Sequence, residues 1–160
     1  MVRLTPMPAS FFQRFVNEAI EGYSRDNVTS GRWSESEAEA KSRAELERFL
    51  PEGIATPGHC VCVVQSGESE EPIGTLWFGE MVREERQIAY VFDLRIYSDF
   101  RRRGYAASAL REVENFVILR RLEAIGLHVF SHNAPAVALY KKLGFTSEKG
   151  LMFKRLVHAV

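Results

Sequence analysis

The chain has 160 residues, a length that fits a single domain, residues 1–160, with a buried core. Its 21 basic and 21 acidic side chains balance, which argues against nucleic acid as a partner, because nucleic-acid-binding proteins usually carry a basic excess. The sequence has no run of about 18 apolar residues and no signal-peptide core, so we expect a cytoplasmic protein that does not enter a membrane.

The first residues predict a short strand at 2–5, followed by a helix. Apolar side chains recur at helical spacing in SFFQRFVNEAIEGY, residues 10–23. Ser10 and Gln13 have the spacing of a capping box at the start of this helix. The polar residues 24–33 predict the connection to the next element.

A second helix is predicted to begin after Ser34. This serine is a suitable cap, and Glu37 stands three residues later as its capping-box partner. Apolar residues continue at helical spacing until Pro51, which ends the helix.

The middle of the chain is rich in Val, Ile, Phe, Tyr and Trp. The segments HCVCVVQ, IGTLWFGEMV and QIAYVFDLRIY are separated by polar stretches and predict an antiparallel meander of three strands. In the first strand, Cys60 and Cys62 point to the same face and cannot easily form a disulfide. We interpret them as small buried hydrophobic side chains rather than a metal or redox pair, because no second cysteine pair accompanies them.

Helical spacing returns from Arg103 to about Leu122, and AIGLHVF then predicts a strand, which completes a strand–helix–strand unit. The next segment, NAPAVALYKKLG, predicts a short helix with Asn133 as cap, Pro135 in the first turn and Gly144 as the stop. The segment LMFKRL predicts a closing strand. The expected fold class is therefore α/β (α+β): a mixed, mostly antiparallel twisted sheet with helices on both faces.

The turn before the predicted long helix concentrates positive charge. Arg101, Arg102 and Arg103 precede Gly104, where the strand ending in IYSDF leads into the helix. A helix start directs unpaired N–H groups outwards, and Gly104 and Ala106 let an anion approach the main chain. Taken alone, the three arginines are equally well explained as a solvated loop.

The spacing Arg101-x-x-Gly104-x-Ala106 resembles the Gln/Arg-x-x-Gly-x-Gly/Ala pyrophosphate loop of the GNAT superfamily of N-acetyltransferases. DLRIYSDFRRRGYAASAL resembles the strand, loop and helix of that family, and HVFSHNAPAVALYKKLGF resembles its next strand and second cofactor helix. The resemblance covers roughly residues 87–147. Two positions depart from the commonest pattern: Ala106 stands where Gly is common, and Ser98 where Pro is frequent.

This resemblance implies an acyltransferase that uses acetyl-CoA as cosubstrate and transfers the acetyl group directly to a primary amine of a small molecule or peptide. It also implies a splayed strand pair that holds the pantetheine arm. The implied cofactor-binding residues are Leu94, Ile96, Arg101, Arg102, Arg103, Gly104, Tyr105, Ala106, Ala107, Asn133, Ala136 and Tyr140. Tyr140 is further implied as the catalytic acid that protonates the departing thiolate.

Asp93 is the candidate catalytic base. It is an acid inside the apolar strand AYVFDLRIY, where a carboxylate is costly to bury. Its position corresponds to an acidic residue of some polyamine-type members of the family. A structural carboxylate, at a strand bulge or in a salt bridge such as one with Arg95, is an equally weighted alternative. Glu80 and His59 are weaker candidates, more consistent with surface groups at strand ends.

Two other functional interpretations are alternatives to an enzyme. A non-catalytic coenzyme A-binding module has the same fold, and a nucleotide binder of another fold would need glycine-rich spacings that the sequence lacks. His128 and His132 do not form a convincing ligand pair, so we predict no metal. The acceptor remains unspecified, although Asp26 and Glu80 could attract a cation and Trp33 and Trp77 could cover its apolar part. Dimers are common in the family, so a homodimer is compatible with the resemblance.

Overall fold

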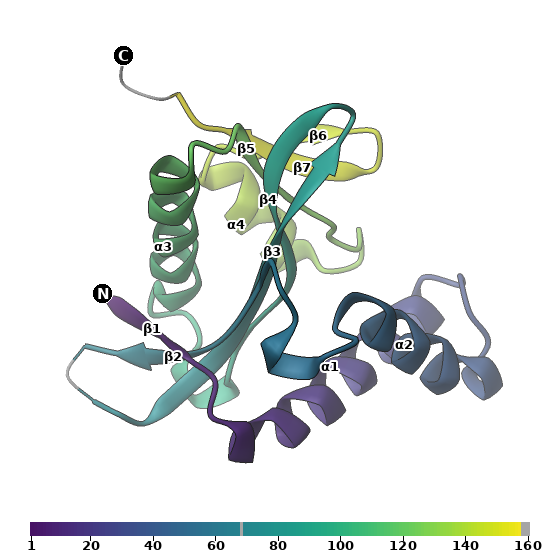
Figure 1. Ribbon diagram of the computed structural model, residues 1–160. Coiled ribbons are helices and arrows are strands. Elements are labelled where there is room, and N and C mark those ends of the chain that lie inside the picture. The colour runs from purple at the N-terminus through teal and green to yellow at the C-terminus, as the bar shows by residue number, and fades with distance from the viewer. Residues whose placement is uncertain (68, 158–160) are drawn as a thin grey trace.

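Seven strands form one sheet in the computed structural model, which describes residues 1–67 and 69–157 (Figure 1). Their order across the sheet is β1-β2-β3-β4-β5-β7-β6. Every neighbouring pair is antiparallel except β4 and β5, which confirms the predicted mixed sheet. The strands are β1 (Val2–Pro6), β2 (His59–Ser66), β3 (Pro72–Arg83), β4 (Arg86–Ile96), β5 (Ala124–Leu127), β6 (Thr146–Glu148) and β7 (Leu151–Arg155).

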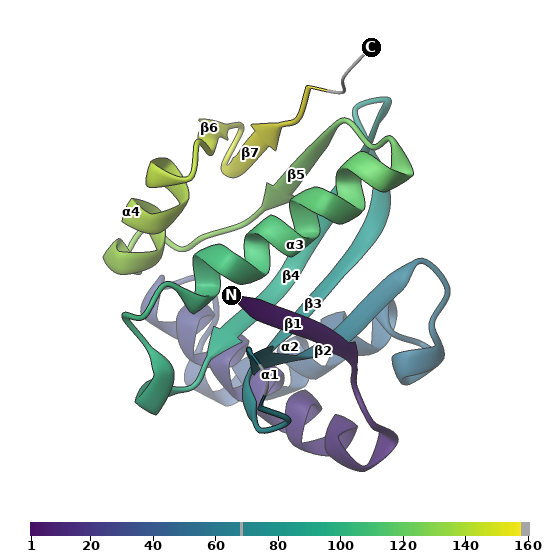
Figure 2. The same ribbon diagram turned by 90° about the vertical axis from the view of Figure 1, so that its left-hand side faces the viewer.

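Helices cover both faces of this sheet, as predicted. Figure 2 shows α3 in front of the strands, with α1 and α2 behind them. The helices are α1 (Ala9–Thr29), α2 (Glu35–Phe49), α3 (Tyr105–Arg120) and α4 (Ala134–Lys142), with short 3-10 turns η1 (Gly53–Ala55) and η2 (Ser98–Phe100). The antiparallel meander is β2–β3–β4, and β4–α3–β5 is the strand–helix–strand unit.

The buried hydrophobic side chains form three clusters, and the two largest lie on opposite sides of the sheet because side chains alternate along the strands. Leu76 and Phe78 of β3 lie in the core beneath α3, where Val113 is also buried. Trp77, between them, points to the opposite core and meets Phe15 of α1 edge to face. The sheet therefore separates the α3 side from the α1 and α2 side wherever its strands are paired.

Helix α1 differs from its prediction at its start. The helix begins at Ala9, one residue before the predicted segment 10–23. The residue in front of it, Pro8, has an extended backbone (φ −62°, ψ 144°). Ser10 therefore lies inside the first turn and makes no cap, and the predicted capping box with Gln13 is wrong. Gln13 instead donates a hydrogen bond to Asn17 Oδ1, one turn along the helix.

The end of α1 also differs, because the helix continues through most of the predicted connection, residues 24–33. Ser24 Oγ donates to a carbonyl one turn earlier, and Asn27 Nδ2 does the same. These polar side chains are thereby satisfied within the helix, so their polarity does not end it. Strand β6 was not predicted, and β5 stops at Leu127 rather than continuing through Phe130.

The predicted capping box of α2 is confirmed. The main-chain N–H of Ser34 donates to Glu37 Oε1 at 3.1 Å, and the Ser34 side chain accepts from the third helical N–H. We expect Ser34→Ala to lower the free energy of unfolding by about 1 kcal/mol, measured by urea denaturation. Ser34→Asp retains a capping oxygen and should stay near the parent. Equal stability of Ser34→Ala and the parent would contradict this role.

Candidate active site

Strand β4 contains a bulge that decides the orientation of Asp93. Trp77 of β3 pairs with Asp93, but the next residue of β3, Phe78, pairs with Val91. Phe92 is therefore an extra residue, and such a residue reverses the alternation of the side chains that follow. Val91 lies in the core beneath α3, and Phe92 packs with the α1 and α2 core. The bulge thus places Asp93 on the same side as Phe92.

Next to this bulge, β4 and β5 separate. Their parallel pairing runs from Ile88 with Ala124 to Val91 with Leu127 and then ends. Beyond this point Leu94 and Ile96 of β4 continue to pair with β3 only. The separation is the splayed strand pair expected from the sequence, and it leaves one edge of β4 facing a gap in the sheet.

The arginine turn leads from this splayed strand into α3. Gly104 caps the helix with a left-handed backbone (φ +80°), and a side chain at this position would have open space around it. Gly104, Tyr105 and Ala107, at the start of α3, line a groove, as an anion site at a helix start requires. The arginines differ in what they contact: Arg101 Nε donates to the main-chain oxygen of Ile96 at 2.8 Å, whereas Arg103 lies over the Phe100 ring.

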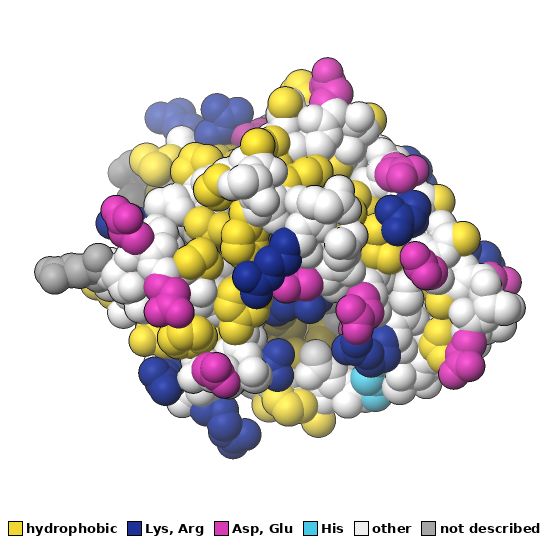
Figure 3. All heavy atoms as spheres, turned by 90° about the horizontal axis from the view of Figure 1, so that it is seen from below, with side chains coloured by type: hydrophobic (Ala, Val, Ile, Leu, Met, Phe, Trp, Pro, Cys, Tyr) yellow, Lys and Arg dark blue, Asp and Glu magenta, His cyan; other side chains and the backbone are white. Residues whose placement is uncertain are grey.

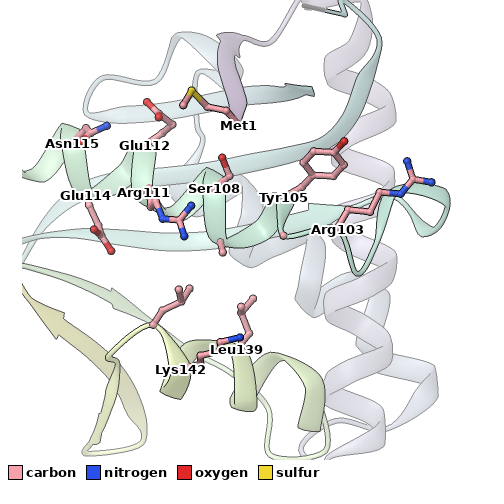
Figure 4. A pocket seen from close by; sticks show the side chains of 13 residues that line it. Met1, Arg103, Tyr105, Ser108, Arg111, Glu112, Glu114, Asn115, Leu139 and Lys142 are labelled. Carbon is pink, nitrogen blue, oxygen red and sulfur yellow. The ribbon is translucent and has the colours of Figure 1, made fainter. Parts of the chain in front are cut away.

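A groove of about 760 Å³ runs along α3 from this turn (Figure 4). One side of it is formed by α4, through Leu139, Lys142 and Leu143. Its charged lining is mixed: Arg103, Arg111 and Lys142 are basic, and Glu112 and Glu114 are acidic. Tyr105, Ala107 and Ser108 belong to its α3 wall. The groove therefore joins the predicted anion turn to the predicted second cofactor helix.

Helix α4 positions two of the predicted site residues. Asn133 Oδ1 accepts from the N–H of Ala136 and so caps the helix. Tyr140 packs against Phe145, with ring centroids 5.6 Å apart, in the core beneath α3. Burial, and then the nearby Asp93 carboxylate, raise the pKa of Tyr140 to about 12. The phenol is therefore protonated at neutral pH and lies within electrostatic range of Asp93.

Asp93 has an enclosed carboxylate oxygen without a hydrogen-bond partner and a raised pKa. Its Oδ2 atom is enclosed and has no hydrogen-bond partner in the described part of the chain. Burial is the main cause that raises the pKa of Asp93 to about 6, while Arg95 opposes the shift and Glu18 and Asp26 add to it. Of the structural alternatives, the strand bulge is confirmed, because Phe92 is the extra residue next to Asp93. The ion pair with Arg95 is wrong, because Arg95 Nη2 donates instead to the main-chain oxygen of Glu18 at 2.8 Å.

Charged side chains surround the end of the molecule where α1 and the arginine turn lie. Figure 3 views this end and shows acidic and basic side chains around a central hollow. Arg14 Nε pairs with Glu18 Oε1 at 2.9 Å on α1, and Asp26 pairs with His132 at 3.0 Å. The tryptophans expected near an acceptor are instead buried, with Trp33 8% and Trp77 5% exposed.

His128 was considered from the sequence only as a metal ligand, and its place beside the gap between β4 and β5 was not predicted. It directly follows Leu127, the last residue of β5, at the point where β5 leaves β4. Its ring meets Phe130 edge to face, and the charges of Arg32 and of Asp26 on α1 act on it. Partial burial, followed by Arg32, lowers the pKa of His128, so its imidazole is neutral at pH 7. Strand parity could have marked this residue as a second candidate base.

The weaker sequence candidates have structural partners. Glu80 Oε1 accepts from Arg120 Nε at 2.7 Å, and His59 Nδ1 accepts from Trp77 Nε1 at 3.0 Å. Cys60 and Cys62 are free and half-buried, and burial raises the pKa of Cys62 to about 12, so this thiol is unreactive.

Within residues 1–67 and 69–157, the His, Cys, Asp and Glu side chains form no group of three able to hold a metal ion. The helices of the described residues also lack the combination of length and apolar character that a membrane span requires.

The fold is a mixed sheet in which the parallel pair β4 and β5 separates beside the N-terminus of α3, where a groove begins. Residues 21–145 match the acetyltransferase (GNAT) family. The uncharacterised N-acetyltransferase YycN of Bacillus subtilis (strain 168) is 29% identical over 155 residues, which are 97% of this chain and 99% of YycN. The uncharacterised N-acetyltransferase YdgE of the same strain is 30% identical over 153 residues, 96% of this chain and 97% of YdgE.

Solved structures agree. The crystal structure of YycN matches with a TM-score of 0.87 at 28% identity, covering 99% of this chain and 100% of that chain. Arabidopsis thaliana NAA60 in complex with acetyl-CoA shares the fold, with a TM-score of 0.68 at 17% identity, covering 98% of this chain and 99% of that chain. The chain therefore belongs to the GNAT family and is an acyltransferase, as the sequence resemblance implied.

Proposed function

We propose that this acyltransferase moves the acetyl group of acetyl-CoA directly onto a primary amine of a small molecule or peptide. Acetyl-CoA fits the residues present, because the helix start at Gly104 offers accessible N–H groups to its pyrophosphate. The separated strands β4 and β5 leave a main-chain edge for its extended arm. The Arabidopsis NAA60 structure contains acetyl-CoA in the same fold, which supports this assignment.

The residues around the gap would handle the two protons of the reaction. Bound acetyl-CoA would supply a thioester whose carbonyl carbon the neutral amine attacks, after which the thiolate leaves. The nitrogen gives up one proton before the attack and a second one after it, and the thiolate takes up one. An amine with a reference pKa of about 10.4 is mostly protonated at pH 7, so a base must accept its proton. Asp93, on the part of β4 that no longer pairs with β5, fills this role, and Tyr140 donates its phenolic proton to the thiolate that leaves.

The observation that carries this proposal is the contrast between Asp93 and Tyr140. The pKa of Asp93, about 6, leaves it mostly ionised at neutral pH, and the pKa of Tyr140, about 12, keeps its proton in place. Two groups whose surroundings drive their pKa values apart are suited to opposite proton transfers. They come from different elements, β4 and α4, and lie close enough for the charge of one to affect the other.

A panel of primary amines tests the proposal. We expect acceptor-dependent release of free coenzyme A thiol when the protein is mixed with acetyl-CoA and diamines, amino acids or peptides with free N-termini. Tight coenzyme A binding with no release for any amine would favour the non-catalytic coenzyme A-binding module. Calorimetric preference for ATP or NAD over coenzyme A would overturn the cofactor assignment.

The arginine turn provides a separate prediction about binding. Gly104→Glu should weaken acetyl-CoA binding by at least about 2 kcal/mol, because it adds a negative side chain where the pyrophosphate would lie. Isothermal titration calorimetry measures this change. Gly104→Asn is the matched control, since asparagine tolerates the left-handed backbone without adding charge. If a folded Gly104→Glu variant binds as the parent does, the pyrophosphate lies elsewhere.

A further inference from the structure

Asp93 is unpaired although an arginine lies two residues away on the same strand. Residues two apart on a strand share a face and are separated by about 7 Å, within reach of a guanidinium. Even so, the structure shows no ion pair of Asp93 within residues 1–67 and 69–157. The Arg95 guanidinium is held instead by the main-chain oxygen of Glu18 in α1, at 2.8 Å.

Gly22 makes this contact sterically feasible. It lies one turn after Glu18, and a Cβ atom built on Gly22 would lie only 2.7 Å from Arg95 Nη2. A glycine inside a helix destabilises it by about 1 kcal/mol relative to alanine, so its presence in α1 needs a reason. The space that it leaves is occupied by the end of the Arg95 side chain.

We propose that Gly22 is a positioning residue for the acetyl-transfer reaction: it lets α1 hold Arg95 away from Asp93, so that the Asp93 carboxylate stays free to accept a proton from the amine. This inference rests on the proposed function, because it assumes that Asp93 is the base. With the Glu18 carbonyl blocked, the flexible guanidinium turns to a buried, unpaired carboxylate oxygen. Asp93 Oδ2 and Glu18 Oε2 are the two in the described residues, and Asp93 shares a face of β4 with Arg95.

The charges that face Asp93 come from three elements. Arg95 on β4 favours the ionised form, whereas Glu18 and Asp26 on α1 oppose it. Tyr140 on α4 is neutral at physiological pH, and Arg14 on α1 is paired with Glu18. Arg95 is therefore the cation whose movement changes the proton affinity of Asp93 most. An approaching cation lowers a carboxyl pKa by about 1 to 3 units.

Carboxyl carbon NMR tests this directly, without an acceptor. The chain has three aspartates, Asp26, Asp93 and Asp99, so protein labelled with ¹³C-aspartate gives a simple spectrum in which Asp93→Asn identifies one signal. We expect Gly22→Ala to lower the titration midpoint of Asp93 by about one pH unit or more. Arg95→Met, which keeps the apolar stem but removes the charge, should raise the midpoint.

The double variant separates this mechanism from a general disturbance of α1. Gly22→Ala combined with Arg95→Met should titrate like Arg95→Met alone, because the alanine then has no cation to displace. Asn17→Ala, at an exposed position of the same helix, should leave the midpoint unchanged. A midpoint that does not move in Gly22→Ala, or one that moves equally in both backgrounds, overturns the inference. Full activity of Asp93→Asn would overturn the proposed base instead, whatever the midpoints are.

Discussion

Tyr140→Phe should lose on the order of 100- to 10,000-fold in turnover while it binds acetyl-CoA nearly as the parent does. The substitution keeps the ring and its contact with Phe145, so the packing of α4 against the core is preserved. It removes the only proton that this side chain can donate. Because burial raises the pKa of Tyr140 to about 12, that proton is present throughout the neutral range in the parent.

Two measurements decide this prediction: steady-state rates with any accepted amine, and the dissociation constant for acetyl-CoA. A matched variant, Tyr90→Phe, removes a half-buried phenol of β4 whose ring packs against Phe92, and it should leave turnover near the parent value. Turnover of Tyr140→Phe within about threefold of the parent would leave water as the proton donor. Tyr140 would then be a packing residue between α4 and Phe145.

Much of the fold is encoded in local patterns that a sequence displays directly. The β2–β3–β4 meander follows from the run of β-branched and aromatic residues between polar turns, and the ends of α4 follow from Asn133 and Gly144. The cap of α2 is equally local. Such features need only neighbouring residues, so they are predictable from one sequence.

The geometry of the site depends on contacts that no local pattern contains. The bulge at Phe92 reverses the orientation of Asp93, and AYVFDLRIY does not reveal which residue is the extra one. The partner of Arg95 is Glu18, 77 residues earlier, so pairing with the nearer Asp93 seemed as reasonable from the sequence. The role of His128 likewise depends on where β5 leaves β4.

Asp93→Asn should lower kcat/KM by about 100- to 10,000-fold near pH 7.5, because the amide cannot accept the proton of the amine. In the parent, activity should rise as pH increases through about 6, the pKa of Asp93, since the base must be ionised. The variant should lose this acidic limb. The apparent KM for a cationic acceptor should also rise more than that for acetyl-CoA, because a negative charge beside the amine is removed.

The pH dependence of the free energy of unfolding tests the raised pKa of Asp93 independently of activity. The folded pKa of Asp93 is raised above its ordinary value of 3.8, so the stability contributed by the protonated form is present at low pH and lost as pH rises through about 6. Asp93→Asn avoids that loss and should therefore be more stable than the parent above pH 6, with the difference fading below pH 4. Urea denaturation at several pH values measures this difference.

His128→Gln is the companion variant for the pH–activity profile. If His128→Gln abolishes the acidic limb of that profile while Asp93→Asn retains it, the base is the histidine at the end of β5.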